Sequence, residues 1–318
     1  MIKIGFFGTP ELAKNVLEDI CDSNRFEVCF AVTQADKPVG RGLEIKESPV
    51  KAYSKEKSIP VYSPEKIRNN NEFIDEINKY EADYFIVVAY GKIMPNEILE
   101  MPKKMCINVH GSILPKYRGA SPIQSALMAG DKVTGVTIMK MSEGMDEGDI
   151  IDILEIGIDK FDTSELLYEK FQKVSGRFLI DTLDKLDKGV IQAKKQDNSL
   201  ATYCKKINKE DGLADFNKSA EILFNLWKGL TPWPGLYTQY KDKKLIIVEC
   251  DYDLLLSDIA VSYDLGEVIV SDKGIGIVCS DGILILKKIK LEGKKAQDIN
   301  DFINGYKDLI GYNFLCSI

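Results

Sequence analysis

The sequence predicts an α/β domain with a doubly wound, mostly parallel sheet, followed by a small β-barrel domain. Strand-like and helix-like segments alternate over residues 1–189, a pattern typical of parallel sheets covered by helices. Short apolar runs separated by turns fill residues 208–318, a pattern typical of small antiparallel barrels. The length of 318 residues also fits two domains of roughly 150 residues each.

The first domain opens with a strand and a capped helix. Lys3–Phe7 is an apolar run that ends at Gly8, and Thr9 is predicted to be the N-cap of a helix over Glu11–Cys21. The remaining elements of this domain are expected in the following order: strand Phe26–Thr33, a long loop over 34–48, helices Val50–Lys57 and Glu72–Lys79, strands Tyr84–Ala89 and Met105–His110, a helix from Ser121 to Ala129, strands Val133–Met141 and Ile150–Ile158, and helix Ser164–Leu186.

The texture of the sequence changes after Gly189. Residues 190–207 are polar with no strong apolar period, and we interpret them as a linker. The second domain, residues 208–318, is expected to contain a helix over Ala220–Gly229 and strands over Leu236–Tyr240, Leu245–Glu249, Gly266–Ser271, Gly276–Ser280 and Ile283–Lys290.

Composition excludes several classes of protein. The net charge of −7 disfavours bulk binding to nucleic acid or anionic membranes, although a local basic patch stays compatible with it. The chain has no apolar run of the ~20 residues that cross a bilayer, and its start lacks the features of a signal peptide. We therefore expect a cytoplasmic protein with no membrane partner, acting as a monomer.

Cysteine and histidine usage argues against disulfides and metal sites. The seven cysteines are odd in number and scattered without a C-x-x-C pair, which indicates free thiols in a reducing compartment. His110 is the only histidine, so a zinc site built on two or three histidines is excluded. We expect no metal.

The strongest candidate for chemistry is Asn108-Val109-His110 at the end of a predicted strand. Residues two apart on a strand share a face, and open α/β sheets bind ligands beyond the carboxyl ends of their strands. The glycine-flanked acidic turn around Asp146 follows between two later strands. An amide, an imidazole and a carboxylate suit acyl-type transfer, as oxyanion donor, general acid or base, and partner of the histidine.

Other interpretations compete with this one. Asn108 and His110 could be structural, and Gly5, Gly8 and Thr9 only weakly suggest a nucleotide-binding turn. A serine hydrolase would use Ser112 with His110, but Ser112 does not lie in a G-x-S-x-G elbow. A transferase or hydrolase that uses the same three residues on a small amine or on water, and a non-catalytic nucleotide- or RNA-binding module, also remain open.

Several stretches spread over nearly the whole chain carry a family resemblance: FFGTPELA (6–13), TQADKPVGRG (33–42), VVAYGKIMP (87–95), the block from INVHGSILP to GDII (107–151), YCKKINKEDG (203–212), TPWPG (231–235) and DGILILKKIKLEGKKAQ (281–297). In these stretches the sequence resembles the methionyl-tRNA formyltransferases, within the folate-dependent formyltransferases. The long loop and the second domain are more specific to that family than the Asn-x-His block. One departure is Ala35, where the family usually has a proline.

The resemblance implies transfer of the formyl group of 10-formyltetrahydrofolate to the α-amino group of methionyl initiator tRNA, for translation initiation. It implies a Rossmann-like catalytic domain and an OB-like tRNA-binding barrel, with neither metal nor covalent enzyme intermediate. Asn108 would donate a hydrogen bond to the developing oxyanion, His110 would stabilise the tetrahedral intermediate and help to move the proton, and Asp146 would orient His110.

The resemblance also implies the binding residues. The folate would lie against two loops, mainly through backbone groups: Val88, Ala89, Tyr90 and Gly91, and Ser112, Ile113, Leu114 and Pro115. The loop at 34–48 would reach the acceptor end of the tRNA through Arg41. A cluster of lysines in the second domain would follow the RNA phosphates, unless it is only a solvated face: Lys287, Lys288 and Lys290, with Lys294 and Lys295 nearby.

Overall fold

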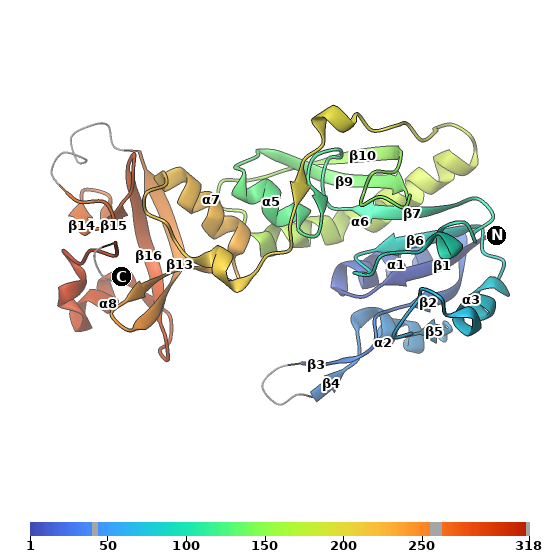
Figure 1. The fold of residues 1–318 in the computed structure, drawn as a ribbon, viewed down its shortest axis with the longest axis horizontal. Coiled ribbons are helices and arrows are strands. Elements are labelled where there is room, and N and C mark those ends of the chain that lie inside the picture. The colour runs from blue at the N-terminus through green and yellow to red at the C-terminus, as the bar shows by residue number, and fades with distance from the viewer. Residues whose placement is uncertain (40–43, 255–262, 316–318) are drawn as a thin grey trace. The chain divides into compact units, whose positions relative to one another are not determined.

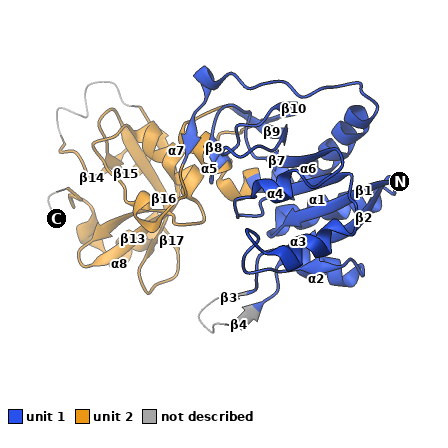
Figure 2. Ribbon diagram, turned by 45° about the vertical axis from the view of Figure 1, so that its right-hand side comes forward, with its two compact units in different colours: residues 1–122, 133–157, 168–204 blue, residues 123–132, 158–167, 205–318 orange. Residues whose placement is uncertain are grey.

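The structure, a computed structural model, describes residues 1–39, 44–254 and 263–315. These residues divide into two compact units (Figure 2). The first unit comprises residues 1–122, 133–157 and 168–204, and the second comprises 123–132, 158–167 and 205–318. Most of the segment interpreted as a linker, residues 190–204, thus packs as part of the first unit.

The first unit is built on a seven-stranded sheet with the order β10-β9-β7-β6-β1-β2-β5 (Figure 1). Strands β7, β6, β1, β2 and β5 are parallel, whereas β9 pairs antiparallel with both β7 and β10. The predicted, mostly parallel sheet is confirmed. The strands are β1 (Ile2–Gly8), β2 (Phe26–Val32), β5 (Val61–Tyr62), β6 (Tyr84–Val88), β7 (Met105–His110), β9 (Val133–Lys140) and β10 (Ile150–Gly157).

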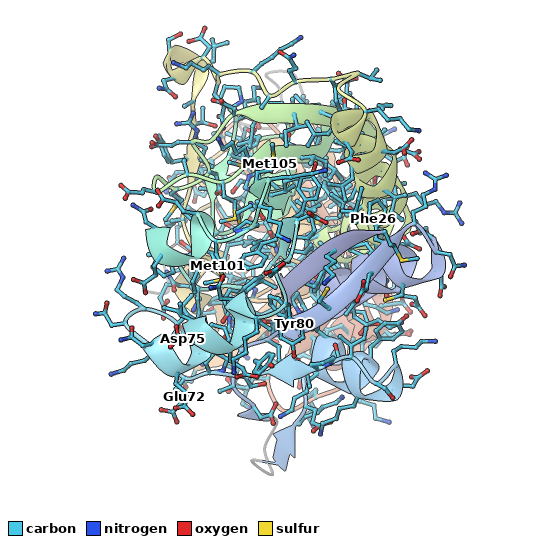
Figure 3. The ribbon with its side chains drawn as sticks, turned by 90° about the vertical axis from the view of Figure 1, so that its right-hand side faces the viewer. Phe26, Glu72, Asp75, Tyr80, Met101 and Met105 are labelled. Atoms are coloured by element: carbon cyan, nitrogen blue, oxygen red, sulfur yellow. The ribbon has the colours of Figure 1, made fainter. Side chains whose placement is uncertain are left out.

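The parallel strands are apolar because both of their faces are covered. All five residues of β6 are buried. Gly5 in β1 makes room for the ring of Phe30, since a Cβ at Gly5 would lie 2.3 Å from Cζ of that ring. Figure 3 views the molecule from the end at which Phe26 and Met105, the first residues of β2 and β7, both lie. The carboxyl ends of these strands therefore meet at the opposite edge of the sheet.

The helices between the strands begin at recognisable capping residues. The side chain of Ser48 accepts a hydrogen bond from the backbone N–H of Lys51 at the start of α2, and Asn70 does the same for α3 through Phe73. The helices are α1 (Glu11–Asp22), α2 (Pro49–Glu56), α3 (Asn71–Asn78), α4 (Asn96–Leu99), α5 (Pro122–Met128) and α6 (Ser164–Asp187). The residues of α5 after Pro122 and the first turn of α6 belong to the second unit.

Two local predictions in the first unit need correction. The side chain of Thr9 does not cap α1: its hydroxyl donates to the carbonyl oxygen of Tyr90 at 3.3 Å and accepts from the backbone N–H of Gln34 at 3.4 Å. The residues predicted as a loop, 34–48, include a short antiparallel hairpin of β3 (Lys37–Val39) and β4 (Glu44–Lys46). The Thr9 hydroxyl instead connects two loops at the carboxyl edge of the sheet.

The second unit is a small antiparallel domain, which confirms the predicted barrel-like class. Its main sheet has the order β12-β13-β16-β15-β14, and β17 pairs with β16. The indole N–H of Trp227 on α7 donates to the carbonyl oxygen of Val248 in β13 at 3.0 Å, within the apolar core. The elements are α7 (Ala220–Leu230), β12 (Leu236–Tyr240), β13 (Lys243–Asp253), β14 (Val268–Ser271), β15 (Gly274–Val278), β16 (Ile283–Leu291), β17 (Gln297–Asp298) and α8 (Ile299–Gly305).

The described cysteines are free thiols, and most of them are buried. Burial raises the pKa of Cys106, of Cys250 and, to about 12, of Cys279. These side chains stay protonated and pack as small apolar groups. Among the described residues, no helix is both long and apolar enough to cross a membrane.

Candidate active site

Asn108 and His110 lie at the carboxyl end of β7, between β6 and β9 in the middle of the first unit's sheet. Asn108 pairs in register with Met139 and His110 with Thr137. His110 is buried, with 5% of its surface exposed, whereas Asn108 is half-buried. The polar side chains therefore stand at the end of a rigid, buried strand.

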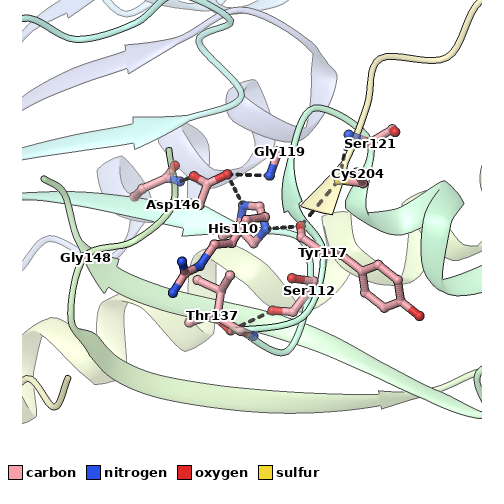
Figure 4. Close-up of polar contacts among 12 residues, drawn as sticks. His110, Ser112, Tyr117, Gly119, Ser121, Thr137, Asp146, Gly148 and Cys204 are labelled. Carbon is pink, nitrogen blue, oxygen red and sulfur yellow. Dashed lines mark hydrogen bonds and ion pairs between the residues drawn. The ribbon is translucent and has the colours of Figure 1, made fainter. Parts of the chain in front are cut away.

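The acidic turn brings Asp146 to His110 (Figure 4) and also to Asn108. Its Oδ1 accepts a hydrogen bond from Nδ2 of Asn108 at 3.4 Å, and its Oδ2 lies 3.6 Å from Nδ1 of His110. The backbone N–H of Gly119 donates to the same Oδ2 at 2.8 Å, which fixes the carboxylate. The structure thus brings together the three residues predicted to be catalytic.

The second ring nitrogen of His110 defines the tautomer. Nε2 lies 3.0 Å from the carbonyl oxygen of Tyr117 (Figure 4). Because a carbonyl oxygen only accepts hydrogen bonds, Nε2 carries the proton in the neutral ring. Nδ1 is then the nitrogen that can take up a proton, on the side of the ring that faces Asp146.

The position of Ser112 argues against the serine-hydrolase interpretation. Its side chain is fully buried, and its hydroxyl donates to the carbonyl oxygen of Lys116 at 2.6 Å. Its own carbonyl accepts from the hydroxyl of Thr137, which also accepts from the backbone N–H of Leu114 (Figure 4). A nucleophile has to reach both a base and the substrate, and this hydroxyl is committed to holding the loop after β7.

Replacing Ser112 by alanine should therefore leave the catalysed reaction within about threefold of the rate of the unchanged protein. The substitution removes one internal hydrogen bond, which stabilises a fold by about 1 kcal/mol. Steady-state kinetics and a thermal melt would measure the two effects separately. A loss of activity as large as that expected for His110→Ala, or labelling of Ser112 by a fluorophosphonate, would restore the hydrolase interpretation.

The two loops predicted to bind folate follow neighbouring strands. Val87 of β6 pairs with Asn108 of β7, so the segments 88–91 and 112–115 leave the same edge of the sheet. In the first, Val88 and Tyr90 are buried while Ala89 and Gly91 are exposed, with φ of 44° and 77°. In the second, Ser112 and Leu114 are buried, and Ile113 and Pro115 are half-buried.

Buried side chains leave backbone groups as the main polar surface of these loops. Burial raises the pKa of Tyr90 to about 12, so its phenol stays neutral, and its carbonyl oxygen accepts from Nε2 of Gln34 at 2.7 Å. A Cβ at Gly91 would lie 2.4 Å from that same Nε2. A flat heterocycle with amide-like edges, such as a pterin, is suited to backbone groups of this kind.

The residues predicted to contact tRNA are not part of this cluster. Lys287, Lys288 and Lys290 lie on β16 of the second unit, where Lys287 and Lys290 are exposed and Lys288 is half-exposed. No ion pair joins any of them to a described residue. Arg41 lies outside the residues that the structure describes.

The described residues form no candidate metal centre. Within residues 1–39, 44–254 and 263–315, no group of three or more His, Cys, Asp or Glu side chains is arranged to hold a metal ion.

Sequence reasoning missed the residues that surround Asp146 and Tyr117. Arg118 is 1% exposed and donates to Oε1 of Gln196, to Oδ1 of Asn198 and to the hydroxyl of Tyr203. Gln196 and its neighbours come from the stretch interpreted as a linker. A polar stretch without periodicity gives no sign that it will be ordered by a buried arginine from another loop.

The fold and the site fit an enzyme that transfers a group, and two models of one transferase family match the chain. The formyl transferase model matches residues 2–183, and the model of the formyl transferase C-terminal domain matches residues 206–307. The chain therefore belongs to the formyl transferase family and is an enzyme of that family.

The most similar relatives include methionyl-tRNA formyltransferases. That of Sulfurihydrogenibium sp. (strain YO3AOP1) is 42% identical over 320 residues, which cover 98% of this chain and 100% of the relative. That of Caldicellulosiruptor saccharolyticus is 40% identical over 306 residues, which cover 96% and 97%. The resemblance predicted from the motifs is confirmed.

A solved structure supports the fold. The N-formyltransferase from Helicobacter canadensis, determined in complex with folinic acid and dTDP-3-aminofucose, aligns with a TM-score of 0.67. The alignment covers 90% of this chain and 98% of the other, at 20% identity. At that identity the likeness concerns the fold alone.

Proposed function

We propose that this enzyme transfers the formyl group of 10-formyltetrahydrofolate to the α-amino group of methionyl initiator tRNA. The observation that carries the proposal is the convergence of Asn108, His110 and Asp146 at one edge of the sheet. It occurs in a chain that is similar over nearly its whole length to methionyl-tRNA formyltransferases. The product, N-formylmethionyl-tRNA, serves translation initiation, which assigns the enzyme to the cytoplasm.

Each member of the cluster has a chemical task in this reaction. Attack of the amine puts negative charge on the formyl oxygen, and the amide nitrogen of Asn108 can donate to that oxygen with its second hydrogen. The incoming amine must lose a proton, which Nδ1 of His110 can take up. Asp146, held by Gly119, then faces the charged ring and stabilises it. As the tetrahedral intermediate collapses, the bond between the formyl carbon and N10 of the folate breaks, and the ring can return the proton to that leaving nitrogen.

The donor fits the loops 88–91 and 112–115 as a co-substrate. These loops present backbone groups and apolar walls beside Asn108 and His110, because their larger side chains are turned into the core. The bound donor supplies the activated formyl group. The chain supplies a binding surface, orientation and hydrogen-bond donors.

Formation of N-formylmethionine tests the proposal directly. The enzyme is incubated with 10-formyltetrahydrofolate and charged initiator tRNA, and the esterified amino acid is analysed. Glycinamide ribonucleotide serves as a small-amine competitor, and His110→Ala as the inactive control. Formylation of the small amine but not of the tRNA would assign the enzyme to another branch of the family.

The lysines of β16 are proposed to follow the RNA phosphates. Changing Lys287, Lys288 and Lys290 to alanine should weaken tRNA binding and reduce the slope of log K against log salt by about 1 for each lysine that contacts a phosphate. Binding assays over a salt series measure the slope. Lys273→Ala, at an exposed turn of the same unit, is the matched control. An unchanged slope in the triple variant would mean that these lysines form only a solvated face.

Arg41 is proposed to hold the acceptor end of the tRNA. The charged residues of its loop sum to zero, so the loop offers reach and a planar guanidinium rather than general attraction. Arg41→Ala should lower kcat/KM for methionyl-tRNA and leave the folate KM unchanged, and Arg41→Lys should rescue only part of the loss. Arg25→Ala, at an exposed site of the first unit, is the control. Normal formylation by Arg41→Ala would contradict the role.

A further inference from the structure

We propose that residues 196–204, here called the bracing segment, set the geometry of the catalytic cluster, with Gln196 and Arg118 as positioning residues. This inference rests on the proposed function, because it assigns work to residues around Asp146 and His110. The bracing segment contains a 3-10 turn, η1 (Asn198–Leu200), and the short strand β11 (Tyr203–Cys204), which pairs with β8 (Arg118–Gly119). All these residues belong to the first unit.

Gln196 holds the turn that carries Asp146. Its Nε2 donates to the carbonyl oxygen of Asp146 at 2.8 Å and to that of Gly148 at 2.7 Å. Asp146 has a φ of 54°, in the left-handed region that a non-glycine residue adopts only at a conformational cost. Such a conformation persists where surrounding contacts over-determine it. One side-chain amide supplies two of those contacts.

Arg118 fixes the direction of the Gln196 amide. Its Nε and Nη2 both donate to Oε1 of Gln196, at 3.1 and 2.8 Å. With its oxygen committed to the guanidinium, the amide can only present its nitrogen to the turn. Nη2 also donates to Asn198 at 2.7 Å and Nη1 to the hydroxyl of Tyr203 at 3.3 Å. Nη1 also lies 3.8 Å from Oε1 of Glu147, the neighbour of Asp146, so this buried arginine holds the turn both through the bracing segment and directly.

The other end of the bracing segment holds the acceptor of His110. The backbone N–H of Tyr117 donates to Oγ1 of Thr202 at 2.8 Å, and Sγ of Cys204 lies 3.4 Å from the carbonyl oxygen of Tyr117 (Figure 4). That carbonyl, on a residue with a φ of 59°, accepts from Nε2 of His110. The bracing segment therefore fixes both the carboxylate and the histidine tautomer.

A purely structural role predicts a different result from a positioning role. If the bracing segment only stabilised the fold, substitutions in it would lower the melting temperature and reduce activity in every background equally. If it positions Asp146, its effect on kcat should vanish once the Asp146 carboxylate is gone. The two roles therefore separate in a double-mutant cycle.

Gln196→Glu is the informative variant. The glutamate carboxylate keeps one oxygen for Arg118. It lacks the two N–H donors of the amide, so its other oxygen faces the carbonyl oxygens of Asp146 and Gly148. We expect kcat for formyl transfer to fall by about 10- to 100-fold, the effect of a small misplacement of reacting groups, with both KM values within about threefold. Leu200→Ala, at an exposed apolar side chain of the same segment that takes no part in these hydrogen bonds, is the matched control and should stay within about twofold.

The cycle with Asp146→Ala decides the mechanism. Gln196→Glu should cause no further loss of kcat in the Asp146→Ala background, whatever its effect on the melting temperature. Equal losses in both backgrounds, or an unchanged kcat for Gln196→Glu alone, would overturn the positioning role.

A second readout is independent of activity. His110 is the only histidine of the chain, so ¹⁵N labelling of histidine gives the Nδ1 and Nε2 signals of one ring in the untagged protein. At a pH where the ring is neutral, NMR should show the Nε2–H tautomer in the unchanged protein and a mixture in Thr202→Val, which lacks the acceptor for Tyr117. If no tRNA is formylated but the tautomer shifts, the proposed function fails and the bracing role stands. If formylation is normal and the tautomer is the same in both proteins, the bracing role of Thr202 is wrong.

Discussion

His110→Ala is expected to lower kcat for formyl transfer by about 100-fold or more, with little change in either KM. In the proposed mechanism the imidazole takes up the proton of the amine, and with only 5% of its surface exposed it adds little contact area for substrate binding. Asn108→Ala should have a comparable effect, because losing one oxyanion donor costs about 3–4 kcal/mol of transition-state stabilisation. Steady-state kinetics with charged initiator tRNA measure both.

The contacts among the three residues predict that their effects are not independent. Asp146 touches both Asn108 and His110, so removing it disturbs the geometry of the other two. Double variants should therefore lose much less activity than the product of the single losses. Ser112→Ala, in the loop that follows β7 and outside the cluster, is the control. Losses that multiply would mean that the residues act separately.

The fold of the first unit was predictable because its central strands, β1 and β6 above all, are buried on both faces. Continuous apolar runs such as Tyr84–Val88 carry a strong signal, and their predicted bounds differ from the structure by a residue or two. Short elements such as α4 (Asn96–Leu99) and β5 (Val61–Tyr62) were missed, since so few residues show no period. The prediction for Thr9 is wrong because the local sequence does not distinguish a threonine that caps a helix from one that hydrogen-bonds to distant loops.

The catalytic cluster was predictable only in part. Asn108 and His110 share a strand face by periodicity alone, the glycine-flanked acidic turn indicated a carboxylate partner, and the family resemblance singled out Asp146 in that turn. The residues assigned to folate and tRNA binding also come from the resemblance, and these assignments stay predictions. Periodicity could not reveal Arg118 or Gln196, because the contact between them joins residues 78 positions apart. Such long-range polar contacts are a property of the folded chain.

Gly148→Ala is expected to lower kcat by about 100-fold, although it lies outside the reacting groups. A Cβ at Gly148 would lie 1.7 Å from the carbonyl oxygen of Lys140, far inside contact distance. The backbone of β9 cannot yield easily, because the N–H of Lys140 donates to the carbonyl oxygen of Asp149 at 2.8 Å. The turn itself must therefore shift, and it carries Asp146 and an acceptor of Gln196.

The result separates close packing from ordinary loss of glycine flexibility. Gly157→Ala, at the far end of β10, is the matched control: nothing lies within 4 Å of a Cβ there, and the residue is exposed. It should keep full activity, whereas Gly148→Ala should retain folate and tRNA binding but lose turnover. Circular dichroism and a thermal melt establish that both variants fold. A folded Gly148→Ala with normal kcat would show that the turn can move without displacing the Asp146 carboxylate, and the dependence of catalysis on its position would be disproved.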